Sequence, residues 1–136
     1  MSTLSILVVD DEPNIRALFH DALQRSGYQV VTAASGPEAL SLAGNQRFDL
    51  AFLDIKMPGL SGVDTLKALK QLNPDVNVVM ITGYAAQDLV AASLDSGAFF
   101  CLTKPFGVAQ ILEVVRTIND EDEPEPEPEP VEAAAE

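Results

Sequence analysis

The amino-acid sequence predicts an α/β fold, in which a central parallel β-sheet is covered by helices on both faces. The first observation behind this is a set of five short apolar runs, mostly unalternated, at residues 5–9, 28–34, 50–53, 76–81 and 99–102. Such runs are typical of parallel strands that are buried on both faces. The second is a helix-like pattern after each run. This alternation favours right-handed crossovers and hence a doubly wound, five-stranded parallel sheet.

The first helix is expected to follow the first strand. Its apolar residues recur at the spacing of one helical face, formed by Ile15, Leu18, Phe19, Ala22 and Leu23. Pro13 suits the first turn of this helix, and Gly27 suits the chain reversal after its end. The second strand is therefore expected directly after Gly27.

The later helices differ in how distinct their apolar faces are. Segment 36–46 is short and places Ala39, Leu40 and Ala43 inward. The next helix stops at Asn73-Pro74 and has an apolar face made of Val63, Leu66, Leu69 and Leu72. Segment 86–96 is rich in Ala and Ser, and its pattern is weaker. The last helix, 107–118, places Ile111, Leu112, Val115 and Ile118 on one face.

Length and charge favour one folded domain followed by an acidic tail. The 136 residues suit a single domain, which we place at residues 1–119. Residues 120–136 hold nine acids, no base and a Glu-Pro repeat, so we expect a disordered tail. Taking these nine acids from the total of 21 leaves 12 against 8 bases, a net charge of −4 for the domain. Neither part offers the basic patch that direct nucleic-acid binding needs.

Composition also bears on the compartment. Cys101 is the single cysteine, so no internal disulfide can form, which fits a reducing cytoplasm. No apolar stretch approaches the roughly 20 residues of a membrane span. No N-terminal segment has the pattern of a signal peptide. We therefore expect a cytoplasmic protein that does not enter a membrane.

Polar residues that follow the predicted strands form the candidate site. Asp10 and Asp11 follow the first strand, Asp54 the third, Thr82 the fourth and Lys104 the fifth. Ligands of open α/β sheets bind beyond the carboxyl ends of the strands, so we expect these groups to converge. Clustered carboxylates repel one another unless a cation intervenes, and Mg²⁺ prefers oxygen ligands together with a phosphate. The set therefore predicts a Mg²⁺ site with a carboxylate nucleophile for a phosphoryl group.

Each of these residues also has a simpler interpretation. An acid pair before a helix often caps it, and an aspartate after a strand is often a turn residue. Lys104 could be a solvated loop residue, and Thr82 before Gly83 could belong to a turn. The functional interpretation is favoured because each group falls at the same end of a different strand. No glycine-rich loop of the Walker type is present, which argues against ordinary nucleotide hydrolysis.

Four segments in order, ILVVDDE, LAFLDIKMPGLSG, MITGYA and GAFFCLTKPF, resemble the receiver domains of response regulators in two-component signalling. The resemblance covers about residues 4–118. It implies a flavodoxin-like sheet with strand order 2-1-3-4-5. It also implies that Asp54 is the phosphoacceptor, that Thr82 and Lys104 contact the phosphoryl group, and that Mg²⁺ is bound by Asp10, Asp11, Asp54 and the backbone carbonyl of Lys56.

The sequence departs from the family pattern at one position. Receivers usually carry Tyr or Phe three residues before the lysine, as a switch that turns inward on phosphorylation. Here that position is Cys101, which leaves the usual coupling to Thr82 open. Phe100 is aromatic but is the strand neighbour of Cys101, so it should point to the opposite face and cannot replace the missing ring.

The resemblance implies a phosphorylation-dependent switch of the stand-alone receiver type, and not an enzyme beyond its own phosphoryl transfer and autodephosphorylation. The expected partners are a histidine kinase or histidine phosphotransfer protein and an unidentified downstream protein; a dimer linked to phosphorylation stays open. We expect the output face to be helix 86–96, strand 99–102 and helix 107–118. Two alternatives remain, a phosphate-independent pseudo-receiver and a Mg²⁺-dependent phosphatase with an aspartyl-phosphate intermediate. Lys56 stands where such phosphatases carry a second acid, which counts against the latter.

Overall fold

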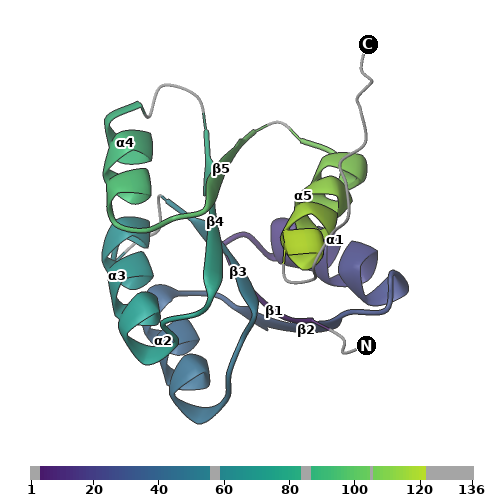
Figure 1. Cartoon of the computed structure of the whole chain (residues 1–136), viewed down its shortest axis with the longest axis horizontal. Helices are drawn as coiled ribbons and strands as arrows, with labels where there is room; N and C mark the ends of the chain where they lie inside the picture. Colours follow the sequence, from purple (N-terminus) through teal and green to yellow (C-terminus); the bar gives the residue numbers. More distant parts are fainter. Residues whose placement is uncertain (1–3, 56–58, 84–86, 105, 122–136) are drawn as a thin grey trace.

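A five-stranded parallel sheet forms the centre of the molecule (Figure 1). The computed structural model describes residues 4–55, 59–83, 87–104 and 106–121. The strands lie in the order β2-β1-β3-β4-β5, and every neighbouring pair is parallel. The α/β fold, the doubly wound sheet and its strand order are therefore confirmed.

The elements alternate strictly along the chain. The strands are β1 (Ser5–Val9), β2 (Gln29–Ala33), β3 (Leu50–Asp54), β4 (Asn77–Thr82) and β5 (Phe100–Thr103). The helices are α1 (Pro13–Arg25), α2 (Gly36–Asn45), α3 (Gly62–Leu72), α4 (Gln87–Asp95) and α5 (Val108–Glu121). Because α5 continues to Glu121, the folded part extends into the segment predicted as tail. The rest of that tail lies outside the described residues.

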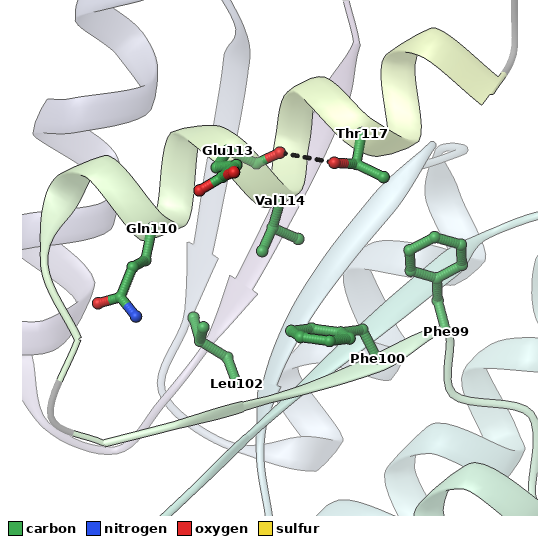
Figure 2. A pocket seen from close by; sticks show the side chains of 7 residues that line it. All are labelled: Phe99, Phe100, Leu102, Gln110, Glu113, Val114 and Thr117. Atoms are coloured by element: carbon green, nitrogen blue, oxygen red, sulfur yellow. Dashed lines mark hydrogen bonds between the residues drawn. The ribbon is translucent and has the colours of Figure 1, made fainter. Parts of the chain in front are cut away.

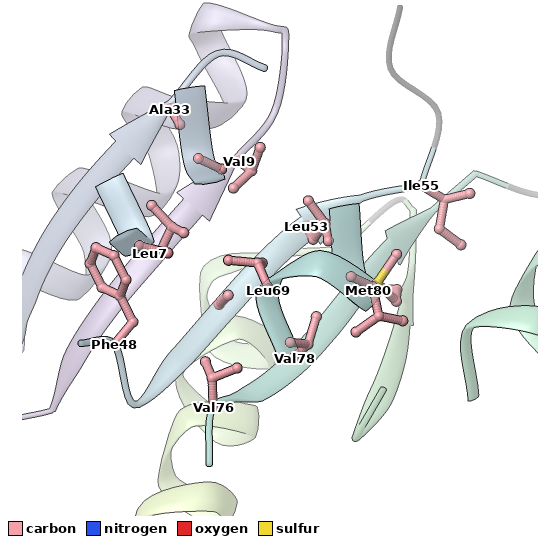
Figure 3. Close-up of a cluster of buried hydrophobic side chains, with 14 residues drawn as sticks. Leu7, Val9, Ala33, Phe48, Leu53, Ile55, Leu69, Val76, Val78 and Met80 are labelled. Carbon is pink, nitrogen blue, oxygen red and sulfur yellow. The ribbon is translucent and has the colours of Figure 1, made fainter. Parts of the chain in front are cut away.

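Two hydrophobic layers cover the sheet. Helices α1 and α5 lie on one face, and α2, α3 and α4 lie on the other (Figure 1). Side chains alternate along each strand, so Ile6 and Val8 pack toward α1 and α5 while Leu7 and Val9 join the opposite cluster (Figure 3). On the first face the ring of Phe19 from α1 lies 4.8 Å from that of Phe52 in β3, measured between centroids.

The expectation that all five strands are buried on both faces is right only for the three central ones. Every residue of β3 is buried, and β1 and β4 are buried except at their first residue. The strands β2 and β5 have mixed exposure and bury one residue each. They form the two edges of the sheet, where no further strand covers the outer side.

Two leucines predicted to face inward are exposed instead. Leu18 of α1 is 36% exposed, because the ring of Phe19 makes the contact with the sheet and Leu18 lies about 100° around the helix from it. Leu72 is 48% exposed, because it is the final residue of α3 and no further helical turn follows to cover it. Apolar spacing therefore predicts these helices correctly but overestimates the width of the face that each helix buries.

Candidate functional site

Three carboxylates converge at the carboxyl edge of the sheet. Strands β1 and β3 are neighbours, with Val9 paired to Leu53, so the residues that follow them lie side by side. Asp10, Asp11 and Asp54 each offer an oxygen, and these atoms lie within 4.8 Å of one another. Asp10 and Asp54 are buried and Asp11 is exposed. The structure thus brings together the three acids singled out in the sequence.

Asp10 is the most constrained of the three acids. Its Oδ1 accepts a hydrogen bond of 2.9 Å from the backbone N–H of Glu12. Its Oδ2 is buried and has no hydrogen-bond partner among the described residues. Burial raises the pKa of Asp10, while the Glu12 N–H and the charge of Lys104 oppose that rise. Asp10 is therefore held by one oxygen and leaves the other available to a ligand.

The loop that carries Asp10 and Asp11 is fixed by helix α1. Glu12 is the N-cap residue of α1, but its side chain makes no capping hydrogen bond. Arg16 reaches back from the first turn, and its guanidinium Nη1 donates a 2.7 Å hydrogen bond to the backbone carbonyl of Asp10. The alternative in which the acids serve to cap the helix is therefore not supported, since the Asp10 carboxylate bonds to Glu12 and not to a helical N–H.

Thr82 and Lys104 complete the edge from the next two strands. Thr82 is the last residue of β4 and is buried, and its hydroxyl donates to the carbonyl of Gly83 at 2.9 Å. Lys104 directly follows β5 and is half-buried. Its backbone N–H donates to the Thr82 carbonyl at 2.8 Å, and its charge lowers the pKa of Asp10. Both residues therefore stand at the edge where the sequence predicts them.

Asp54 ends β3 at the middle of the sheet. The N–H of Ile55 donates to the carbonyl of Ile81 at 2.9 Å, so the pairing with β4 continues one residue beyond Asp54. On the other side, the N–H of Gly62, the first residue of α3, donates to the carbonyl of Ile55 at 3.0 Å. Lys56, whose carbonyl is the predicted fourth metal ligand, lies outside the described residues.

Cys101 and Phe100 point to opposite faces of β5, as strand alternation predicts. Cys101 is half-buried against the cluster beneath α2–α4, and burial raises the pKa of its thiol. Phe100 is 45% exposed and lines a groove of about 280 Å³ between β5 and α5 (Figure 2). Phe99, Leu102 and Val114 form the rest of its apolar wall. Phe100 therefore does not occupy the position of the missing aromatic.

Comparison with known proteins identifies the family. The response regulator receiver domain matches residues 6–116. The chain belongs to the response regulator receiver family. It is 35% identical over 116 residues to sporulation initiation phosphotransferase F of Bacillus subtilis, covering 85% of this chain and 94% of that protein. It is 38% identical over 117 residues to the response regulator protein PilR of Pseudomonas aeruginosa, covering 86% of this chain but only 26% of that protein.

Solved structures agree with this assignment. A CheY-like receiver domain protein from Methanospirillum hungatei superposes with a TM-score of 0.84 at 33% identity, over 89% of this chain and 98% of that one. The chemotaxis protein CheY4 of Vibrio cholerae gives a TM-score of 0.81 at 31% identity, over 86% and 99% of the two chains. The receiver domain therefore has a CheY-like, flavodoxin-like fold.

Family membership gives the acidic cluster its meaning. The carboxylates of Asp10, Asp11 and Asp54 are consistent with the Mg²⁺ site of a receiver domain. They fit that ion because hard carboxylate oxygens converge and the buried Oδ2 of Asp10 has no partner in the described part of the chain. The match is to signalling receivers, which partner histidine kinases or phosphotransferases, and not to conventional enzymes.

Among the described helices, none has the length and hydrophobicity to cross a bilayer.

Two residues to which no sequence pattern assigned a role also shape this receiver site. Arg16 binds the carbonyl of Asp10, and Gly62 lies against the backbone of Asp54 and Ile55. Arg16 lies within two helical turns of the acids, a weak signal of proximity. The spacing between Asp54 and Gly62 gave no comparable signal, because their contact depends on the path of the intervening loop.

Proposed function

We propose that this receiver domain is a phosphorylation-dependent signalling switch in which Asp54 accepts a phosphoryl group from a phosphohistidine. The observation that carries the proposal is the convergence of Asp54 with Asp10 and Asp11 at one edge of the sheet. The donor is a histidine kinase or a histidine phosphotransfer protein. The Bacillus subtilis relative is a sporulation initiation phosphotransferase, which supports a role in phosphoryl transfer.

The chemistry follows from the groups at that edge. A carboxylate oxygen of Asp54 attacks the phosphorus, the P–N bond of the phosphohistidine breaks, and the imidazole nitrogen leaves with the electron pair. Asp10, Asp11 and the carbonyl of Lys56 would hold Mg²⁺, which when bound offsets the charge that develops on the transferred group. The ammonium of Lys104 offsets part of the same charge. Asp10 and Asp11 orient the site and do not react.

The switch runs from Thr82 toward β5 and α4. Phosphorylation adds about −1.5 to −2 charges at the strand ends. The phosphoryl oxygens can accept the hydrogen bond that the Thr82 hydroxyl otherwise donates to the Gly83 carbonyl. That exchange would move the chain after Thr82, which leads into α4. The output face is then α4, β5 and α5, with the groove at Phe100 as its apolar part. A downstream protein, or a second copy in a phosphorylation-linked dimer, binds there.

The first experiment measures the intact mass after incubation with Mg²⁺ and acetyl phosphate. We expect one phosphoryl adduct on the wild type and none on Asp54→Asn, and the adduct should not form when Mg²⁺ is chelated. Lack of any adduct on the wild type, also with a purified histidine kinase, would leave the phosphate-independent pseudo-receiver. Continuous release of phosphate from added phosphomonoesters would instead indicate a phosphatase.

A second experiment tests the output face. Amide exchange of α4, β5 and α5 is compared with and without a beryllium fluoride mimic of the phosphoryl group. We expect protection to change in these elements, with α2 as the internal control. Equal exchange in both states would contradict this output face while leaving the phosphorylation of Asp54 intact.

A further inference from the structure

The structure assigns Gly62 a positioning role. Because this residue has no side chain, the start of α3 lies directly against the backbone of Asp54 and Ile55. This contact holds the acceptor carboxylate of Asp54 in place relative to Asp10 and Asp11. This inference rests on the proposed function, since it concerns the acceptor site. Gly62 itself touches neither a phosphoryl group nor a metal.

The contact leaves no room for a side chain. A Cβ at Gly62 would lie 2.6 Å from the Cα of Ile55 and 2.7 Å from its carbonyl oxygen, and closer still to the carbonyl oxygen of Asp54. All three atoms belong to the backbone, so none can move aside by a change of rotamer. The smallest substitution, to alanine, must therefore shift either the first turn of α3 or the end of β3.

Conformational freedom does not explain this glycine. The glycines with positive φ in the described ranges are Gly27, Gly59 and Gly97, and Gly62 is not among them. Gly62 is the first residue of α3 and has ordinary helical geometry. Alanine is the better helix former, so intrinsic propensity alone would favour Gly62→Ala. The requirement for glycine is thus the close approach itself.

Both sides of this contact are held firmly. On the sheet side, the Ile55 N–H is bonded to β4 through Ile81. On the helix side, the Ser61 hydroxyl accepts the N–H of Asp64, and the Thr65 hydroxyl donates to the Ser61 carbonyl at 2.8 Å. The backbone just after the Asp54 Cα is therefore enclosed between β4 and the first turn of α3. Strain introduced at Gly62 is transmitted to Asp54.

The acceptor site is sensitive to such a shift. Its three acids present oxygens within 4.8 Å of one another, and Mg²⁺ demands near-ideal octahedral geometry. In-line transfer also needs close alignment, and a misplacement of about 1 Å can cost roughly 10²-fold in rate. A displacement of Asp54 relative to Asp10 should therefore weaken metal binding and slow phosphoryl transfer.

The test compares Gly62→Ala with Gly44→Ala. Gly44 is an exposed glycine in the last turn of α2, and a Cβ there meets no atom within 4 Å. In metal-free protein, we expect the backbone amide resonances of Asp54 and Ile55 to shift in Gly62→Ala and to stay unchanged in Gly44→Ala. At saturating Mg²⁺ and acetyl phosphate, phosphorylation of Gly62→Ala should be roughly 10- to 100-fold slower, with a Mg²⁺ dissociation constant about 10-fold higher.

A purely structural role predicts a different pattern. Gly62→Ala would then melt at a lower temperature, yet its folded form would keep the amide resonances of Asp54, the Mg²⁺ dissociation constant and the phosphorylation rate of the wild type. That result overturns the inference. If the wild type takes no phosphoryl group, the proposed function fails, and the metal-free amide resonances still decide the role of Gly62.

A second variant covers the case in which Gly62→Ala does not fold. Ser61→Ala removes the hydroxyl that caps α3 and loosens its first turn without adding atoms near Asp54. Broadened Asp54 and Ile55 resonances and a Mg²⁺ dissociation constant raised about 3-fold would support the inference. Unchanged resonances and affinity in Ser61→Ala would overturn it.

Discussion

Two buried polar side chains, Asn73 and Asp10, lie at opposite edges of the sheet and differ in how completely they are hydrogen-bonded. At the amino edge, the carboxamide oxygen of Asn73 accepts the N–H of Phe48 at 3.0 Å, and its NH₂ donates to the carbonyl of Ala43 at 3.2 Å. At the carboxyl edge, Asp10 receives one hydrogen bond at Oδ1, and its Oδ2 has none from the described residues. Both polar atoms of the Asn73 side chain therefore have a partner, whereas within the described residues Asp10 has one at Oδ1 alone.

This contrast separates stability from function within one domain. A buried polar group contributes to stability when its hydrogen bonds are made and costs free energy when they are not. The amino edge follows the first case, where Lys70 also donates to the carbonyls of Pro74 and Val76. The carboxyl edge has clustered negative charge and one buried oxygen without a partner among the described residues, and both features lower stability but suit a cation. The two edges should therefore respond in opposite ways to substitution.

The largest expected effect lies at the amino edge. Asn73→Ala orphans the Phe48 N–H and the Ala43 carbonyl, so the free energy of unfolding should fall by about 3 kcal/mol. Urea denaturation measures this, and Asn45→Ala, at an exposed asparagine of α2, is the control. The Mg²⁺ affinity of folded Asn73→Ala should equal that of the wild type. A loss of affinity there would show that the two edges are coupled.

At the carboxyl edge, removing the charge should stabilise the protein. Asp10→Asn keeps the shape of the side chain and an oxygen for the Glu12 N–H, and it relieves the repulsion with Asp11. In metal-free solution at pH 7, we expect the free energy of unfolding to rise by about 1–2 kcal/mol. Asp75→Asn, at an exposed aspartate in a surface ion pair with Arg47, controls for loss of one charge. Added Mg²⁺ should then stabilise the wild type more than Asp10→Asn.

The pH dependence should have a defined sign. Burial raises the pKa of Asp10 above its ordinary value of 3.8, so the folded state binds this proton more tightly than the unfolded chain does. The stability that this group provides is thus present below pH 3.8 and is lost as pH rises through the folded-state pKa. The advantage of Asp10→Asn should be constant at pH values above the folded-state pKa of Asp10 and should shrink as pH falls through that pKa toward 3.8. An advantage that stays constant down to pH 3.8 would contradict this account.

The smallest effect is expected at Arg16. Arg16→Ala removes the hydrogen bond to the Asp10 carbonyl, which should cost roughly 1 kcal/mol of stability and raise the Mg²⁺ dissociation constant about 3-fold. Titration with Mg²⁺ measures the second effect. Arg25→Ala, on the same helix but in an exposed ion pair with Asp21, should leave metal binding unchanged. Equal metal binding in both variants would restrict Arg16 to a structural role.

The sequence predicts the site well for a simple geometric reason. The carboxyl ends of parallel strands share one edge, so residues that follow the strands must meet, and Asp10, Asp11 and Asp54 do so. Alternation along β5 likewise places Phe100 and Cys101 on opposite faces. Such inferences need only the period of the strand and the direction of the sheet.

The residues that sequence patterns miss depend on distances across loops. The guanidinium of Arg16 folds back onto a carbonyl, and no apolar spacing encodes that contact. The contact of Gly62 with Asp54 depends on how the chain returns from β3 to α3. Leu18 is exposed because its neighbour in α1, Phe19, makes the contact with the sheet. Each of these contacts depends on the tertiary structure and not on the local sequence pattern.

The thiol of Cys101 is a natural probe of local opening in this domain. It is the one thiol in the chain, it lies half-buried on the side of the sheet that α2–α4 cover, and α4 packs against its strand. Thiol reagents attack the thiolate, and burial disfavours that form, so labelling should be slow while this layer is closed and faster when it opens. The labelling half-time is therefore sensitive to opening of the α4 side of the sheet, without an engineered probe or an added cysteine.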